Sequence, residues 1–273
     1  EFTCKKGGFT IDDLSGIGLG VAGMVDAERS FVYWSSSLEE RNVPFGEAIA
    51  RELPCPVFLD NDANLAGIAE YRIGGAERPD LPFVYLTLST GIGGGIILDG
   101  ELLHGLSSGA GELGHVTVDP TGPRCPCGNH GCLEQMASGT NIARRARARA
   151  RAVGAEGAWL LRQVGGDLEK IRAEEVVAGV AAGDRLSREI WDDTIQYLAI
   201  GIGSIVHVVA PGEVRLGGGL SAAGDLLVAP LRRRLRAHVG YLPVDDIVVD
   251  VARLGHDSAV LGALLLASNQ TTS

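Results

Sequence analysis

One histidine and three cysteines near the middle of the chain have the residue types and spacing of a metal site. The cysteines are Cys125, Cys127 and Cys132, and His115 precedes them. Three thiolates and one imidazole match a closed tetrahedral zinc site, which supports structure and leaves no open position for catalysis. Two alternatives stay open, because His130 could supply the fourth ligand or the three thiols could be free.

Two glycine-rich turns have the composition of phosphate-binding segments. The first is Ser-Thr-Gly-Ile-Gly-Gly-Gly at residues 89–95, and the second is Gly-Gly-Gly-Leu-Ser at residues 217–221. Successive glycine N–H groups can converge on phosphate oxygens, since no side chain blocks the approach. A helix opening at the second turn would also favour an anionic or nucleotide ligand at its N-terminus. Each turn, taken alone, could equally be a simple hairpin or a close packing turn.

Several acidic and polar side chains accompany these motifs. Asn61 and Asp62 stand where a strand gives way to a helix, so Asp62 is either a helix N-cap, the commoner role, or a general base. Glu112 shares a glycine-rich loop with His115, and Glu134 follows the cysteine cluster. A metal in that loop would gather these groups, and several acceptors at one place suit a polyol. The alternative is that the acids lie exposed on a surface loop.

A run of alternating arginines at residues 144–151 has the charge of a nucleic-acid-binding patch. Arginines two positions apart spread around a helix instead of forming one stripe, which favours a solvated helix face. The formal net charge of −10 also argues against a general nucleic-acid binder. His104, His207 and His238 have no partner pattern and are interpreted as structural.

Strand-like and helical segments alternate along the chain, which predicts an α/β fold. Strands are expected at residues 16–21, 56–59, 83–88, 96–98, 213–216 and 247–249. Helices are expected at residues 43–53, 63–71 and 258–268 and over most of residues 139–209. Asp99 and Gly100 are a hairpin-turn signal, and the loop at residues 74–82 is the candidate lobe boundary.

Composition limits the class of protein. The 273 residues are 45% hydrophobic and 21% charged, which predicts one large or two modest folded domains and excludes a mainly disordered chain. No apolar run has the roughly 18 residues of a membrane span, and no apolar signal core stands at the start. We therefore expect a cytoplasmic protein with no membrane partner, where a cysteine cluster more often binds metal than forms disulfides.

In these motifs the chain resembles the ROK family, named for repressors, open reading frames and sugar kinases. The most specific part is Gly-Ala-Gly-Glu-Leu-Gly-His at residues 109–115, followed by Cys-Pro-Cys-Gly-Asn-His-Gly-Cys-Leu-Glu at residues 125–134. Residues 59–64 and the two glycine-rich turns match in the same order. The resemblance covers residues 16–268, which is nearly the whole chain.

The resemblance implies two ribonuclease-H-like lobes of the actin/hexokinase type, with an active site in the inter-lobe cleft. Residues 1–80 would form a small lobe completed by the C-terminal helix at 256–273, and residues 81–255 a large lobe with the zinc loop and nucleotide turns. The family's opening Asp-x-Gly-Gly-Thr motif has no counterpart beyond residues 6–10, so the first lobe is expected to be N-terminally incomplete. Ser37 stands where the family has an asparagine, which changes one sugar contact.

Family roles carry over to matching positions. Asp62 resembles the general base, and this context favours catalysis over capping. His115 would also ligate zinc through its second ring nitrogen, and Mg²⁺ would accompany ATP. The resemblance implies sugar contacts from Asn61, Glu112, His115 and Glu134. It implies that ATP phosphates lie at Thr90, Gly91, Gly93 and Gly94, and adenosine beside Gly217, Gly218 and Gly219.

The resulting hypothesis is an ATP-dependent hexokinase or glucokinase that transfers the γ-phosphate to the 6-hydroxyl of a hexose, with glucose the first choice. The alternative is the effector domain of a sugar-sensing ROK repressor, the one case with a nucleic-acid partner. A third hypothesis is a sugar-binding remnant without catalysis. The resemblance also implies a homodimer or homotetramer.

Overall fold

Contacts within the chain group it into two units. The computed structural model describes residues 6–8, 10–35, 38–53, 55–153, 158–240 and 242–271. Unit 1 comprises Glu1–Pro79, Gly95–Gly111 and Arg253–Ser273, and unit 2 comprises Asp80–Gly94 and Glu112–Ala252. The sequence division assigned residues 95–111 to the larger lobe, whereas their contacts group them with unit 1. The lobe boundaries and the shortened first lobe stay predictions, and Ser37 lies outside the described residues.

Unit 1 contains two small sheets. Strands β1 (Ile17–Val21) and β5 (Val57–Asn61) pair in parallel, with Val21 opposite Asn61. Strands β2 (Met24–Asp26), β3 (Phe31–Ser35) and β4 (Glu40–Val43) form an antiparallel sheet in that order. Apolar side chains of both sheets share one core, which contains Val21, Val25, Val32 and Leu59.

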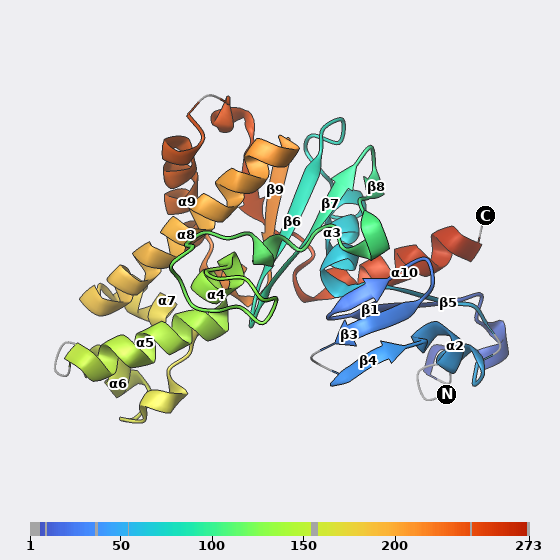
Figure 1. Cartoon of the computed structure of the whole chain (residues 1–273), viewed down its shortest axis with the longest axis horizontal. Coiled ribbons are helices and arrows are strands. Elements are labelled where there is room, and N and C mark those ends of the chain that lie inside the picture. The colour runs from blue at the N-terminus through green and yellow to red at the C-terminus, as the bar shows by residue number, and fades with distance from the viewer. Residues whose placement is uncertain are drawn as a thin grey trace. The chain divides into compact units, whose positions relative to one another are not determined.

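Helices and short 3₁₀ turns accompany these sheets in the described part of unit 1. The helices are α2 (Phe45–Ala50), α3 (Asp62–Arg72) and α10 (Ser258–Thr271), and the turns are η1 (Ile11–Asp13), η2 (Leu106–Ser108) and η8 (Gly255–Asp257). Helix α10 packs on α3 and β1, which Figure 1 shows in red, cyan and blue. The buried Glu70 carboxylate accepts hydrogen bonds from the backbone N–H groups of Arg253 and Leu254, and so fixes the segment that leads into α10.

A five-stranded sheet runs in the order β10-β9-β6-β7-β8. Its strands are β6 (Phe83–Leu88), β7 (Ile92–Leu98), β8 (Glu101–Leu102), β9 (Glu213–Gly217) and β10 (Val248–Val251). Strands β6, β9 and β10 are parallel neighbours, whereas β7 and β8 form an antiparallel hairpin. Every residue of β9 is buried, as expected for a parallel strand covered on both faces.

The helices of unit 2 pack around α8 (Arg185–Val209). Its neighbours are α4 (Leu133–Ala137), α5 (Gly139–Val153), α7 (Ala173–Ala182) and α9 (Asp225–His238). The remaining elements are α6 (Ala158–Gln163), η3 (Leu113–His115), η5 (Leu168–Lys170), η6 (Gly219–Ala223) and η7 (Val244–Asp246). Asp184 caps α8 by accepting the Ser187 backbone N–H at 2.8 Å, and apolar residues such as Ile190 and Ile202 anchor the helix in the core.

The predicted α/β fold is confirmed, whereas the structure corrects the expectation for residues 89–95. Asp99 and Gly100 make the predicted hairpin turn, with φ angles of 50° and 83°. The expected turn at residues 89–95, however, ends early because β7 already begins at Ile92. A Cβ on Gly94 would lie 2.6 Å from Leu113 Cδ1, so this glycine lies within a strand, where it permits close packing against Leu113, and does not form a turn.

The arginine run lies on α5, where Arg144 and Arg151 are exposed as the solvated-face prediction expects, whereas the other arginines of the run are half-buried and contact neighbouring elements. Arg145 donates to Thr194 Oγ1 at 2.6 Å and stacks over Tyr197. Arg149 donates to Glu189 and Asp193 of α8. These guanidinium groups tie α5 to α8 instead of forming a free basic patch.

Among the described residues, no helix has the length and apolar character needed to cross a membrane.

Candidate functional site

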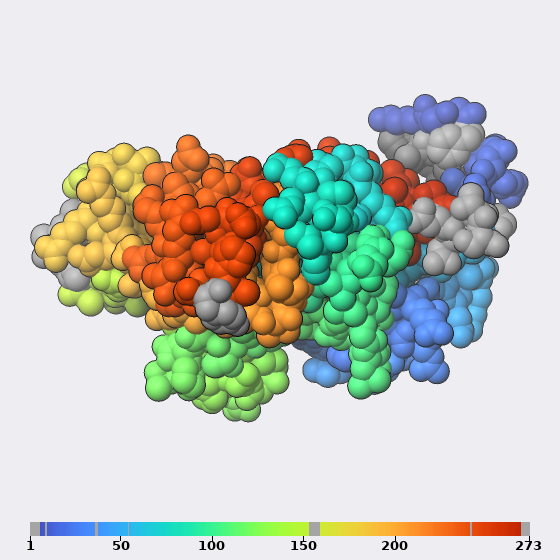
Figure 2. All heavy atoms as spheres, turned by 90° about the horizontal axis from the view of Figure 1, so that it is seen from above, coloured from blue at the N-terminus to red at the C-terminus, as the bar shows by residue number. Residues whose placement is uncertain are grey.

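The cysteine loop places one imidazole and three thiols around a common point in unit 2. The candidate ligand atoms of His115, Cys125, Cys127 and Cys132 all lie within 4.8 Å of one another. His115 Nδ1 is 3.5 Å from Cys125 Sγ, and Cys127 Sγ is 3.6 Å from Cys132 Sγ. The green segment that carries this loop protrudes from the rest of unit 2 in Figure 2. His130 faces elsewhere, because its Nδ1 lies 3.2 Å from the Gly122 carbonyl oxygen.

Hydrogen bonds of the loop backbone hold the cysteines in place. The Cys125 N–H donates to the Asn129 carbonyl at 2.7 Å, and short antiparallel bridges pair Thr117 with Cys132 and Arg124 with His130. Burial raises the pKa of Cys132 to about 12 and also raises the pKa of Cys125. Buried thiols of this kind ionise when a divalent cation binds them, because the positive charge of the cation stabilises the thiolate in place of water. The four residues could therefore hold a tetrahedral metal ion.

Polar side chains expected to contact a sugar lie beside the metal cluster. His115 Nε2 is 3.7 Å from Glu112 Oε2, so one ring nitrogen faces the cysteines and the other faces a carboxylate. Glu134 is the second residue of α4, and η3 packs on that helix. Its Oε2 accepts the Ile92 backbone N–H at 3.1 Å. The structure thus brings Glu112 and His115 together and attaches Glu134 to the start of β7.

Asn61 and Asp62 occupy the junction of β5 and α3 in unit 1. Asn61 is the N-cap, because its Oδ1 accepts the N–H groups of Ala63 and Asn64 at 2.8 and 3.3 Å. Its amide donates one N–H to the Gly23 carbonyl at 3.0 Å and retains a second donor. Asp62 is the first helical residue, and burial raises its pKa above the ordinary 3.8. A half-buried carboxylate with a raised pKa is a suitable proton acceptor.

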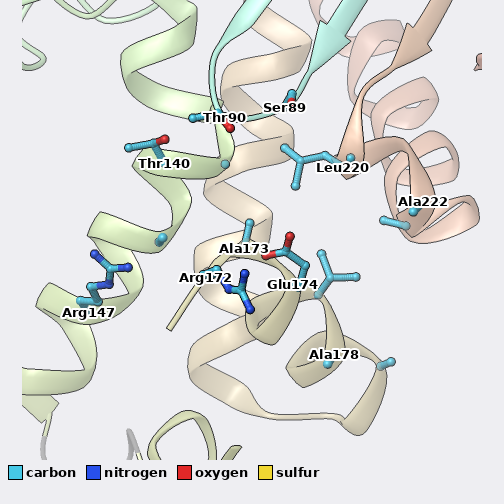
Figure 3. Close-up of a pocket in the computed structure, with 16 residues that line it drawn as sticks. Ser89, Thr90, Thr140, Arg147, Arg172, Ala173, Glu174, Ala178, Leu220 and Ala222 are labelled. Atoms are coloured by element: carbon cyan, nitrogen blue, oxygen red, sulfur yellow. The ribbon is translucent and has the colours of Figure 1, made fainter. Parts of the chain in front are cut away.

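A pocket of about 580 Å³ in unit 2 joins the two glycine-rich turns. Thr90 lines it from the turn that follows β6, and Gly219 lines it from η6. Figure 3 shows Thr90 beside Thr140, and the Thr140 N–H donates to the Thr90 carbonyl at 3.4 Å. The two segments are far apart in the sequence, yet one cavity contains both.

The glycines of these turns have different tasks. A Cβ on Gly219 would meet nothing within 4 Å, so this residue faces the open pocket. Gly218 has φ of 78°, and a Cβ there would lie 2.5 Å from the Leu88 carbonyl oxygen, so packing demands glycine. A Cβ on Gly91 would lie 2.6 Å from Glu134 Oε2. Of the residues predicted to bind ATP, the pocket lining includes Thr90 and Gly219, whereas Gly91, Gly93, Gly94, Gly217 and Gly218 lie outside it.

Sequence reasoning missed most of the pocket wall. Helix α7 supplies an apolar side with Val177, Ala178 and Ala181, and α5 supplies Thr140 and Arg147. Arg172 and Glu174, from the start of α7, also face the cavity (Figure 3). Nothing in the sequence singles out α7, because its alanines and valines are typical of any packed helix. Arg147 belongs to the arginine run, which from its spacing is interpreted as a solvated helix face and not as part of a pocket.

The sequence also indicates no partner for His104, which is interpreted from it only as a structural residue. Its Nε2 lies 2.7 Å from Asp60 Oδ2 in unit 1, and Asp60 immediately precedes Asn61. The hydrogen bond to Asp60 raises the pKa of His104 above the usual 6.5, more than burial lowers it. The other two histidines without a sequence pattern, His207 and His238, lie on α8 and α9.

Comparisons with a family model and with known proteins agree on one family. The family model described as the ROK family matches residues 8–270. A glucokinase of Halalkalibacterium halodurans is 34% identical over 267 residues, covering 96% of this chain and 78% of that protein. A xylose repressor of Caldicellulosiruptor bescii is 27% identical over 274 residues, covering 100% of this chain and 67% of the repressor.

A solved structure agrees with these sequence relatives. The ROK family glucokinase from Streptomyces griseus, in complex with glucose and AMPPNP, has a TM-score of 0.84 and 32% identity, covering 94% of this chain and 82% of that chain. The family match extends over nearly all of the present sequence, and the α/β units with their cysteine loop accord with it. The chain is a member of the ROK family.

Proposed function

We propose that this chain is an ATP-dependent hexose kinase that transfers the γ-phosphate to the 6-hydroxyl of its sugar, with glucose as the preferred substrate. The observation that carries the proposal is the pocket of about 580 Å³ into which both Thr90 and Gly219 open. Its apolar wall from α7 suits a nucleobase, and the polar groups of Thr90 and Thr140 suit phosphates or ribose. The likeness to the glucose- and AMPPNP-bound glucokinase of Streptomyces griseus supports the same assignment.

Asp62 is the proposed general base for the sugar hydroxyl. Phosphoryl transfer depends mainly on alignment and charge neutralisation, so the protein has little covalent chemistry to perform. The Asp62 carboxylate would accept the hydroxyl proton as the oxygen attacks the γ-phosphorus. Mg²⁺ bound with ATP would neutralise charge on the transferring phosphate. The raised pKa of Asp62 supports this role because it brings the proton affinity of the base closer to neutral pH.

The proposed sugar ligands are Asn61 in unit 1 and Glu112, His115 and Glu134 in unit 2. Carboxylates and imidazole accept or donate to separate hydroxyl groups, which is what selects one polyol over another. A zinc ion held by His115, Cys125, Cys127 and Cys132 fits this arrangement, because a Cys₃His set is a closed structural site. The ion would order the loop and fix the ring orientation of His115.

The kinase is tested by phosphoryl transfer from Mg·ATP to glucose, N-acetylglucosamine, N-acetylmannosamine and fructose. ADP release measures the rate, and phosphorus NMR identifies the phosphorylated position. We expect turnover with glucose to exceed turnover with the other sugars. Asp62→Asn should lower kcat by about 10²- to 10⁴-fold, the range for loss of a general base. Full activity of that variant would rule out Asp62 as the base.

A sugar-sensing role is the second candidate, because the xylose repressor of Caldicellulosiruptor bescii aligns with the whole of this chain. A sensor binds sugar without needing ATP, so calorimetry separates the two functions. Sugar binding without ATP binding or turnover would favour a sensor or a catalytically inactive sugar-binding protein. Binding of both ligands with ADP release would favour the kinase.

A further inference from the structure

The buried carboxylate of Asp60 organises the β5–α3 junction that carries the proposed base. Asp60 is only 1% exposed. Its Oδ1 accepts the Asn61 N–H at 2.7 Å and the Asn64 side-chain amide at 3.0 Å. Asp60 therefore binds Asn61 and Asn64, which lie on either side of Asp62 in the sequence. A buried carboxylate is stable only when its charge and its acceptor sites are satisfied.

His104 supplies the remaining partner of Asp60. Its Nε2 is 2.7 Å from Asp60 Oδ2, and its ring lies at the surface, with 38% of the side chain exposed. The backbone of His104 is itself fixed, because its carbonyl accepts the Ala110 N–H at 2.9 Å, and the neighbouring Leu103 N–H donates to Ile96 at 2.8 Å. The raised pKa of His104 favours the imidazolium, which donates a charge-assisted hydrogen bond.

The side-chain amide of Asn64 is oriented by its hydrogen bond to Asp60. Asn64 turns its amide N–H to Asp60 and leaves its own Oδ1 buried without a hydrogen-bond partner in the described structure. Rotating the amide would place two acceptors against each other. The junction thus leaves one acceptor unsatisfied in order to satisfy the Asp60 carboxylate.

We propose that His104 is a positioning residue for phosphoryl transfer, acting through Asp60 to hold Asn61 and Asp62 in the geometry that the reaction needs. This inference rests on the proposed kinase function and extends it to a residue outside the glycine-rich and cysteine motifs. His104 does not touch the reacting atoms. Its hydrogen bond fixes Asp60, Asp60 fixes the residues on either side of Asp62, and the base is aligned as a result.

The first test compares His104→Ala and His104→Gln with the wild type. We expect His104→Ala to lower kcat with glucose on the order of 10- to 100-fold, as a small misplacement of a reacting group does, and to leave KM for ATP unchanged. His104→Gln retains an N–H donor and should lose less. His256→Gln is the control, since His256 is an exposed histidine of unit 1 in η8, and it should match the wild type.

Two further measurements separate positioning from mere structural support. Free imidazole should restore part of the kcat of His104→Ala. The site is partly exposed, so imidazole can enter it, and on this proposal the loss of kcat comes from the missing ring. Adding Asp60→Asn to His104→Ala should cost little more than either change alone, because both act through one hydrogen bond. Thermal unfolding of His104→Gln checks that the fold survives.

The outcomes distinguish this inference from the proposed function. If the wild type phosphorylates no sugar, the kinase assignment falls, and the role of His104 falls with it. If the wild type is active and Asp62→Asn is not, but His104→Ala retains the wild-type kcat, only the His104 inference is overturned. Additive losses for Asp60→Asn and His104→Ala, or no rescue of His104→Ala by imidazole, would also overturn it.

Discussion

Glu134 Oε2 accepts the backbone N–H of Ile92 at 3.1 Å, which joins the helix after the cysteine loop to the first residue of β7. The turn between β6 and β7 includes Thr90, which lines the pocket. One carboxylate therefore links the metal-loop region to the segment proposed to hold ATP phosphates. Its second oxygen, Oε1, is the one that we propose to contact the sugar.

Glu134→Gln tests the two tasks of this carboxylate. Glutamine keeps a carbonyl oxygen that can accept the Ile92 N–H, so the fold should persist. It loses the negative charge, and a hydrogen bond to a charged group is worth about 1.5–3 kcal/mol. We expect KM for glucose to rise about 10- to 100-fold, in line with that energy, while KM for ATP stays close to the wild type. Steady-state kinetics with each substrate varied in turn gives both constants.

The matched control is Glu52→Gln, which makes the same change at an exposed residue of unit 1. It should leave both KM values unchanged. An unchanged KM for glucose in Glu134→Gln would remove Glu134 from the sugar site.

The raised pKa of Asp62 predicts an acid limb in the pH profile. The base works when ionised, so kcat/KM should fall as pH falls through the pKa of Asp62, with a midpoint above the ordinary 3.8. Desolvation disfavours the ionised form in the folded state, which costs stability above that pKa and is relieved by protonation. Asp62→Asn should therefore unfold at the same temperature as the wild type or a higher one at pH 7, although it loses activity.

Calorimetry at pH 7 and at acid pH checks the stability part, and rate measurements across pH check the acid limb. Asp80→Asn, at an exposed aspartate of unit 2, should change neither quantity. A lower melting temperature for Asp62→Asn at pH 7 would mean that the carboxylate stabilises the fold instead of serving the reaction.

Removal of metal should destabilise the cysteine loop. We expect one zinc ion per chain, released by a chelator or by acid, because the four candidate ligands surround one point. Cys132→Ser should lose the ion and lower the melting temperature, since a structural zinc site contributes folding energy. Cys55→Ser also replaces a buried cysteine, but one in unit 1 outside the cluster, and should retain the ion. Equal zinc content in both variants would contradict the assignment.

The apolar wall of the pocket can be filled without disturbing the core. Ala178 is exposed on α7 and lines the cavity, so Ala178→Phe would place a ring where the nucleobase is proposed to bind. We expect KM for ATP to rise about 10-fold or more, while calorimetry shows unchanged affinity for glucose. Ala182→Phe, on the same helix but outside the lining, should bind ATP normally. Equal effects of the two changes would place ATP elsewhere.

Local signals allowed much of the framework to be predicted from the sequence. Asp99 and Gly100 turn the hairpin because they accept positive φ angles, and this preference belongs to the residues themselves. The alternation of apolar strands with helices indicated α/β before any contact was known. Cys125, Cys127 and Cys132 stand within one short loop, so their spacing alone identified them as a cluster, and His115 completes it in the structure.

Long-range packing decided the rest. No local pattern pairs His104 with Asp60, because His104 lies in the loop that follows β8 and Asp60 lies on β5, and the two meet only in the folded unit 1. Thr90 and Gly219 share a pocket because β6 and β9 are parallel neighbours that end at the same edge of their sheet. Arg145 is polar by composition, yet it is partly buried against Thr194 because α5 packs on α8. Sequence encodes backbone preference and the period of burial, whereas the choice of partner depends on which surfaces the folded chain brings into contact.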